Sequence, residues 1–148
     1  MTPTATKIYN ALLSYFETHC TLDATVLPEV GCAEAASFIL QKAGIDVPTA
    51  GIASTAKLYQ WLKSNPRFTR IYAPEPGAII ISPTGYGNGS VAGHVGFLGC
   101  KGHVYPGDWG IVSNDSQTGL LLELWNLTSW QKYYGSVGGL PVAYFRAL

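Results

Sequence analysis

Residues 31–45 read GCAEAASFILQKAGI, and this stretch predicts a helix that begins at a cysteine. Its apolar residues recur with helical spacing and would form one buried face: Ala36, Ile39, Leu40 and Ala43. Gly44 follows, the residue type that commonly ends a helix. Cys32 is therefore expected in the first turn of an amphipathic helix, directly after Gly31.

The segments on either side predict the fold class. Residues 6–20 carry a second helical stripe, and Ser54 can cap a third helix that ends at Asn65 before Pro66. From Pro74 onward the chain breaks into short β-rich runs between glycines: 78–82, 94–100, 109–113, 120–125 and 141–145. Helices followed by strands, without alternation, favour an α+β domain in which N-terminal helices pack on a C-terminal antiparallel sheet of about five to six strands.

Length and charge limit the possible functions. The 148 residues, 47% of them hydrophobic, predict one domain spanning 1–148. Nine basic residues balance nine acidic ones, so we expect no nucleic-acid partner. The apolar runs are far shorter than the roughly 20 residues that span a bilayer, so we expect no membrane partner either. Residues 1–20 lack the pattern of a secretory signal, and we expect a monomer.

Cys32 has the setting of a reactive thiol. Free amides in the first turn of a helix stabilise an anion and can lower the pKa of a cysteine. Gly31 leaves room for a substrate carbonyl, and the amide of Cys32 itself can donate to an oxyanion. The three cysteines, Cys20, Cys32 and Cys100, form no CxxC pair, which argues against a disulfide framework and a thiolate zinc site. A buried structural cysteine is the competing interpretation.

A thiol nucleophile needs a base, and the chain offers three histidines. His19 follows the first predicted helix and His103 lies in a predicted turn, where solvated structural roles are the simpler interpretation. His94 opens the run HVGFLG after a glycine, so it would be fixed on a strand of the sheet. A base on a strand opposite a nucleophile on a helix is the arrangement that Cys–His catalysis requires.

A third polar residue would orient the imidazole. One hairpin return would bring Asn114 or Asp115 beside His94. Alternation places Asn114 on the same face as Val112, which favours Asn114, although an Asn-Asp-Ser cluster is also an ordinary turn composition. Glu34 is expected to be a solvated or capping residue, and Tyr86, in a glycine-rich loop, is the aromatic residue that we expect near substrate.

Three motifs in order carry a family resemblance: Gly31-Cys32 at a helix start, the Pro-Gly-led strand 76–81, and Gly93-His94-Val95-Gly96-Phe97. Together they resemble the NlpC/P60 and CHAP superfamily of papain-like cell-wall hydrolases over residues 28–125. Ala78 stands where an aspartate is usual, which indicates a divergent branch similar to phage lysins or injected amidase effectors. The resemblance implies a papain-like fold and a catalytic Cys–His pair oriented by a third residue, and no cofactor or metal.

The leading hypothesis is a cysteine amidohydrolase with Cys32, His94 and Asn114 as catalytic residues. Its implied partner is the stem peptide of bacterial peptidoglycan, cut as an endopeptidase or an amidase, in a phage lysin or an antibacterial wall hydrolase. Such an enzyme would reach the cell wall after lysis, by injection or as part of a virion. A non-catalytic cell-wall or protein-binding module on the same fold remains an alternative, as does a metal-dependent hydrolase using His94, Cys100 and His103.

Overall fold

The computed structural model describes residues 1–22 and 31–148; positions 28–30, where the family resemblance starts, lie outside it. Within this described part the chain forms a six-stranded antiparallel sheet in the order β1-β6-β2-β3-β4-β5. The strands are β1 (Phe68–Ile71), β2 (Ile79–Ser82), β3 (His94–Lys101), β4 (Trp109–Asn114), β5 (Leu121–Asn126) and β6 (Ala143–Ala147). The helices are α1 (Pro3–Tyr15), α2 (Cys32–Lys42), α3 (Thr55–Ser64), α4 (Leu127–Trp130) and the π-helical segment η2 (Gln131–Val137).

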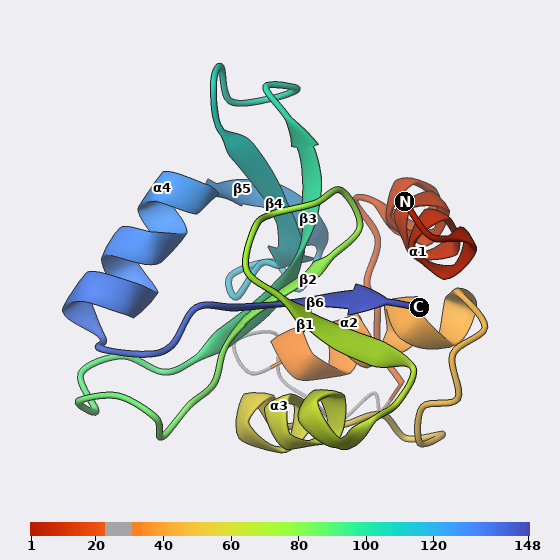
Figure 1. Ribbon diagram of the computed structural model, residues 1–148, viewed down its shortest axis with the longest axis horizontal. Coiled ribbons are helices and arrows are strands. Elements are labelled where there is room, and N and C mark those ends of the chain that lie inside the picture. The colour runs from red at the N-terminus through yellow and green to blue at the C-terminus, as the bar shows by residue number, and fades with distance from the viewer. Residues whose placement is uncertain (23–30) are drawn as a thin grey trace.

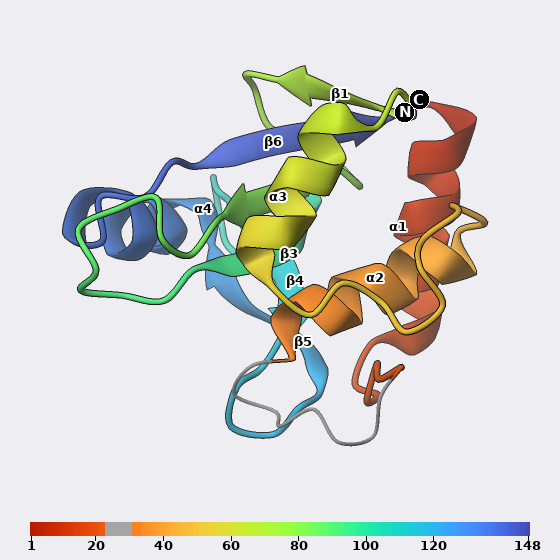
Figure 2. The ribbon, with the colours of Figure 1, turned by 90° about the horizontal axis from the view of Figure 1, so that it is seen from below.

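Helices cover both faces of the sheet (Figure 1). Helices α1, α2 and α3 gather at one side, while α4 and η2 lie at the other, as the turned view also shows (Figure 2). Strand alternation divides the core accordingly. Ile79 and Ile81 pack with the N-terminal helices in a helix-side core, whereas Ile80 packs with Trp130 and Tyr134 in an opposite core.

The helix ends follow from local chemistry. The Ser54 side chain caps α3 by accepting a hydrogen bond from the Lys57 amide at 3.3 Å. Gly44 has φ +83°, a conformation that suits glycine, and lies just beyond the end of α2. Both positions agree with the helix ends that the sequence predicts. At Gly31, the N-cap of α2, no side chain bonds the first-turn amides.

The first helix is shorter than the prediction of 6–20. It begins at Pro3 and ends at Tyr15. Glu17 then takes a positive φ of 64°, and its amide bonds the carbonyl of Leu121 at 2.8 Å. His19 forms an isolated β-bridge with Leu120. Pairing with the start of β5 therefore ends the helix, because an amide that bonds a carbonyl of β5 cannot also continue the hydrogen bonds of the helix.

The predicted α+β class with an antiparallel sheet is confirmed, and all five predicted strands lie within two residues of observed ones. The prediction missed β1, a four-residue strand that pairs with β6 at the edge of the described sheet. It also missed the helical layer of α4 and η2. No helix in the described ranges has both the length and the apolar character needed to cross a membrane.

Candidate active site

Cys32 is the first residue of α2, and its thiol lies where this helix meets the sheet. Backbone hydrogen bonds from Cys32 itself and from Ala33 reach the thiol from the first turn of the helix. A third comes from Val95, the second residue of β3. Gly31 has no side chain that could accept hydrogen bonds from these first-turn amides, and the Cys32 sulfur accepts them instead.

Burial raises the pKa of the Cys32 thiol, and the three backbone hydrogen bonds act against this rise without cancelling it. The sequence predicts the opposite direction, a pKa lowered by the helix start, so this expectation is wrong. The physical reason is desolvation: Cys32 is half-buried between α2 and β3, where a thiolate loses part of its hydration. At neutral pH Cys32 is a protonated thiol and needs a base to become a nucleophile.

His94 is the first residue of β3 and is 9% exposed. The preceding Gly93 packs so closely on β2 that a Cβ there would lie 2.2 Å from the Ser82 carbonyl oxygen. The imidazole stacks on Trp130 and Tyr134, with ring centroids 5.2 and 5.8 Å away. The position of the His94 imidazole is therefore fixed by the pairing of β3, by the close packing of Gly93 on β2 and by the two aromatic rings that stack on it.

Burial also lowers the pKa of His94, to about 4, although the charge of Asp115 acts in the other direction. The imidazole is therefore neutral at pH 7, since protonation would place a cation among aromatic rings. A neutral imidazole has one nitrogen that donates and one that accepts. At rest the Cys32 thiol and the His94 imidazole are therefore both neutral.

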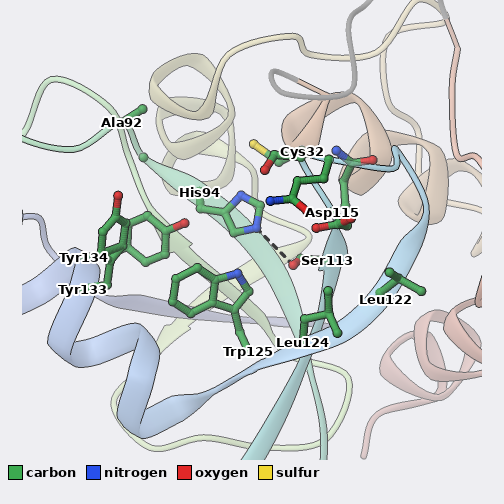
Figure 3. Close-up of a pocket in the computed structure, with 14 residues that line it drawn as sticks. Cys32, Ala92, His94, Ser113, Asp115, Leu122, Leu124, Trp125, Tyr133 and Tyr134 are labelled. Carbon is green, nitrogen blue, oxygen red and sulfur yellow. Dashed lines mark hydrogen bonds between the residues drawn. The ribbon is translucent and has the colours of Figure 1, made fainter.

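Both residues line one cavity of about 300 Å³. The imidazole lies between Cys32 and Ser113, and its Nε2 bonds the Ser113 hydroxyl at 3.0 Å (Figure 3). The other ring nitrogen, Nδ1, is on the side of the ring turned toward Cys32. The structure therefore brings together the predicted nucleophile and the predicted base, which are far apart in the sequence.

Ser113, which sequence reasoning did not identify, occupies the orienting position beside His94. The register pairs Leu98 with Ile111, so alternation places Ile111 and Ser113 on the sheet face that carries His94. Asn114 is the last residue of β4 and is buried, and Asp115 after it is half-buried; both line the same cavity. The hydrogen bond at Nε2 goes to Ser113, and a role for Asn114 or Asp115 in catalysis stays a prediction.

Two neighbouring residues differ from expectation. Glu34 is buried, with 2% exposure, so the expectation of a solvated side chain is wrong, and a capping role stays a prediction. Tyr86 does not line the cavity: its ring packs edge-on against Tyr59, and its hydroxyl bonds the Gln60 side chain on α3. These contacts hold Tyr86 against α3. Three other aromatic residues line the cavity instead: Trp125, Tyr133 and Tyr134.

The alternative metal site does not assemble. His94 opens β3 while Cys100 lies six residues later on the same strand, which corresponds to about 20 Å at strand rise. The Cys100 sulfur contacts the Tyr9 hydroxyl at 3.0 Å, at the far end of the strand. Across residues 1–22 and 31–148, no group of three His, Cys, Asp or Glu side chains is placed to hold a metal ion.

Comparison of the chain with protein-family models and with curated proteins found no match. The geometry of this cavity and the sequence motifs are therefore the basis on which a function is inferred.

Proposed function

We propose that the protein is a cysteine-dependent amidohydrolase that cleaves an amide bond of bacterial peptidoglycan. The observation that carries the proposal is the shared cavity, which is lined by both the Cys32 thiol and the neutral His94 imidazole. The layout also fits the papain-like fold implied by the resemblance, with a nucleophile at a helix start and a base at the start of the neighbouring strand.

The mechanism uses the tautomer of His94 in which Nε2–H donates to the Ser113 hydroxyl. In this tautomer Nδ1 has a free lone pair and accepts the proton of the Cys32 thiol. Ser113 is thus a positioning residue, because it acts through His94. A neutral base suits a neutral thiol, since the proton moves only as the sulfur attacks.

The reaction follows in two steps. The sulfur attacks the amide carbonyl carbon, and the proton taken by His94 passes to the amide nitrogen, which leaves as an amine. Water then attacks the resulting thioester, His94 accepts its proton, and the acid product leaves while the thiol is restored. The amides of Cys32, Ala33 and Val95, which already bond the thiol, stabilise negative charge as the sulfur becomes a thiolate.

Digestion of purified peptidoglycan tests the proposal. The wild type should release new amino groups, and Cys32→Ala should lower the rate about 10³-fold or more while its thermal unfolding stays close to that of the wild type. Cys100→Ala is the matched control. Like Cys32, Cys100 is partly exposed, but it lies on β3 outside the cavity.

Two results would refute the proposal: undiminished release of amino groups by the folded Cys32→Ala protein, or equal loss in Cys32→Ala and Cys100→Ala. Binding of peptidoglycan by the wild type without any release of amino groups would favour the non-catalytic binding module instead.

A further inference from the structure

One wall of the cavity is aromatic and the opposite end is polar. Trp125 at the end of β5 and Tyr133 on η2 contribute exposed ring surface beside His94 (Figure 3). Asp115, Ser116 and Gln117, in the turn after β4, contribute the polar side chains. Ring surface facing hydrogen-bonding groups suits a ligand that is itself a ring with polar edges.

The aromatic wall is held in a fixed position. Trp125 packs edge-on against the fully buried Trp130, with ring centroids 5.9 Å apart, and lies 5.2 Å from the buried Tyr134. Tyr133 lies 5.7 Å from Trp125 at an interplanar angle of 31° and is 43% exposed. A wall that is already ordered loses little conformational freedom when a ligand binds.

The charges of the side chains that line the cavity indicate which part of peptidoglycan it would bind. Among the described residues that line the cavity, none is a lysine or arginine, and Asp115 is the one acidic residue. Stem peptides carry carboxylates, which find no cationic partner here. The N-acetylated sugar next to the lactyl amide is neutral. A volume of about 300 Å³ lies at the lower end of ligand pockets, enough for one ring and the adjoining amide.

We infer that Trp125 and Tyr133 hold the N-acetylmuramoyl ring of the glycan beside Cys32. This inference rests on the proposed function and makes the enzyme an amidase. The bond that breaks is the amide between the lactyl carbonyl of the sugar and the first amino group of the stem peptide. The muramoyl group is then the acyl part of the Cys32 thioester, the stem peptide leaves as an amine, and water releases the lactyl glycan.

Binding to the Cys32→Ala protein tests the inference without turnover. The ligands are N-acetylmuramoyl-L-alanyl-D-isoglutamine and the same dipeptide with an acetyl group in place of the sugar, measured by titration calorimetry. We expect the muramoyl ligand to bind about tenfold or more tightly. Adding Tyr133→Ala should remove this preference. Tyr86→Ala is the matched control, because Tyr86 is also 43% exposed but lies outside the cavity.

Each outcome separates the two proposals. Equal affinity for the two ligands, including failure of both to bind, overturns the inference, as does a preference that survives Tyr133→Ala. If the wild type cuts peptide amides and shows no preference for the sugar, the inference fails while the proposed function stands. If the Cys32→Ala protein prefers the sugar and the wild type cuts no amide, the sugar site stands and the proposed function fails.

Discussion

His94 is expected to make the stability of the protein depend on pH. Its pKa is lowered by burial to about 4 in the folded protein, against 6.5 for an unperturbed imidazole. The unfolded chain therefore takes up the proton at a higher pH than the folded protein does. The folded state has its full stability above pH 6.5 and loses it progressively as the pH falls from 6.5 to about 4. This single group changes the free energy of unfolding by about 2 kcal/mol between about pH 7 and pH 5, and by about 3 kcal/mol near pH 3.5.

Guanidinium unfolding at about pH 7, 6 and 5, followed by tryptophan fluorescence, measures this effect. The wild type should lose about 2 kcal/mol more than His94→Gln over that range, because carboxylates common to both proteins cancel in the difference. His103→Gln removes an exposed imidazole and should behave as the wild type. Parallel stability curves for the wild type and His94→Gln would show that the imidazole is not desolvated, and the neutral resting pair would then be wrong.

Three further predictions concern residues around the site. Gly96→Ala should cost about 1–3 kcal/mol of stability and lower activity, because its Cβ would lie 2.8 Å from a β4 side chain and 2.9 Å from a β4 backbone carbonyl. Gly99→Ala should cost less, since the atom nearest to its Cβ, at 2.7 Å, is the end of a flexible glutamate and the nearest backbone atom is 3.4 Å away. Equal losses would contradict this. Ser113→Ala should reduce kcat by about tenfold to a hundredfold with little change in KM, because it removes the hydrogen bond to His94. Ser116→Ala, which changes an exposed serine on the same cavity, should leave kcat unchanged. An unchanged kcat in Ser113→Ala would remove Ser113 from the mechanism. Ser54→Ala should lower the free energy of unfolding by about 1 kcal/mol and leave activity intact, as measured by denaturant unfolding, and no loss would show that the cap contributes nothing.

Hydrophobic periodicity and the positions of glycines predict those parts of the fold that depend on local sequence. The helix that begins at Cys32 and the cap at Ser54 follow from residue types within a single turn. Strand β1 was missed because it is four residues long, and its place at the sheet edge depends on pairing with β6, more than seventy residues away. The opposite helical layer had one local signal, the capping box between Asn126 and Ser129.

Residue type was enough to select Cys32 and His94 as candidate nucleophile and base, and the structure places both on one cavity. Residue type was not enough where cross-strand register decides. Ser113 depends on which strand residues share a face with His94, and a sequence does not give cross-strand register. The direction of the pKa shift of Cys32 also needed the fold, since burial against β3 outweighs the helix start.

The proposed function requires that the Cys32 sulfur forms a thioester with the acyl part of a peptidoglycan amide, with His94 as its base. The most direct measurement is the intact mass of the protein mixed with soluble muropeptides and quenched in acid during turnover. We expect a mass increase equal to one muramoyl acyl group, located on Cys32 by peptide mapping and absent from Cys32→Ala. An adduct on Cys20 or Cys100 instead, or turnover by the Cys32→Ala protein, would contradict the claim.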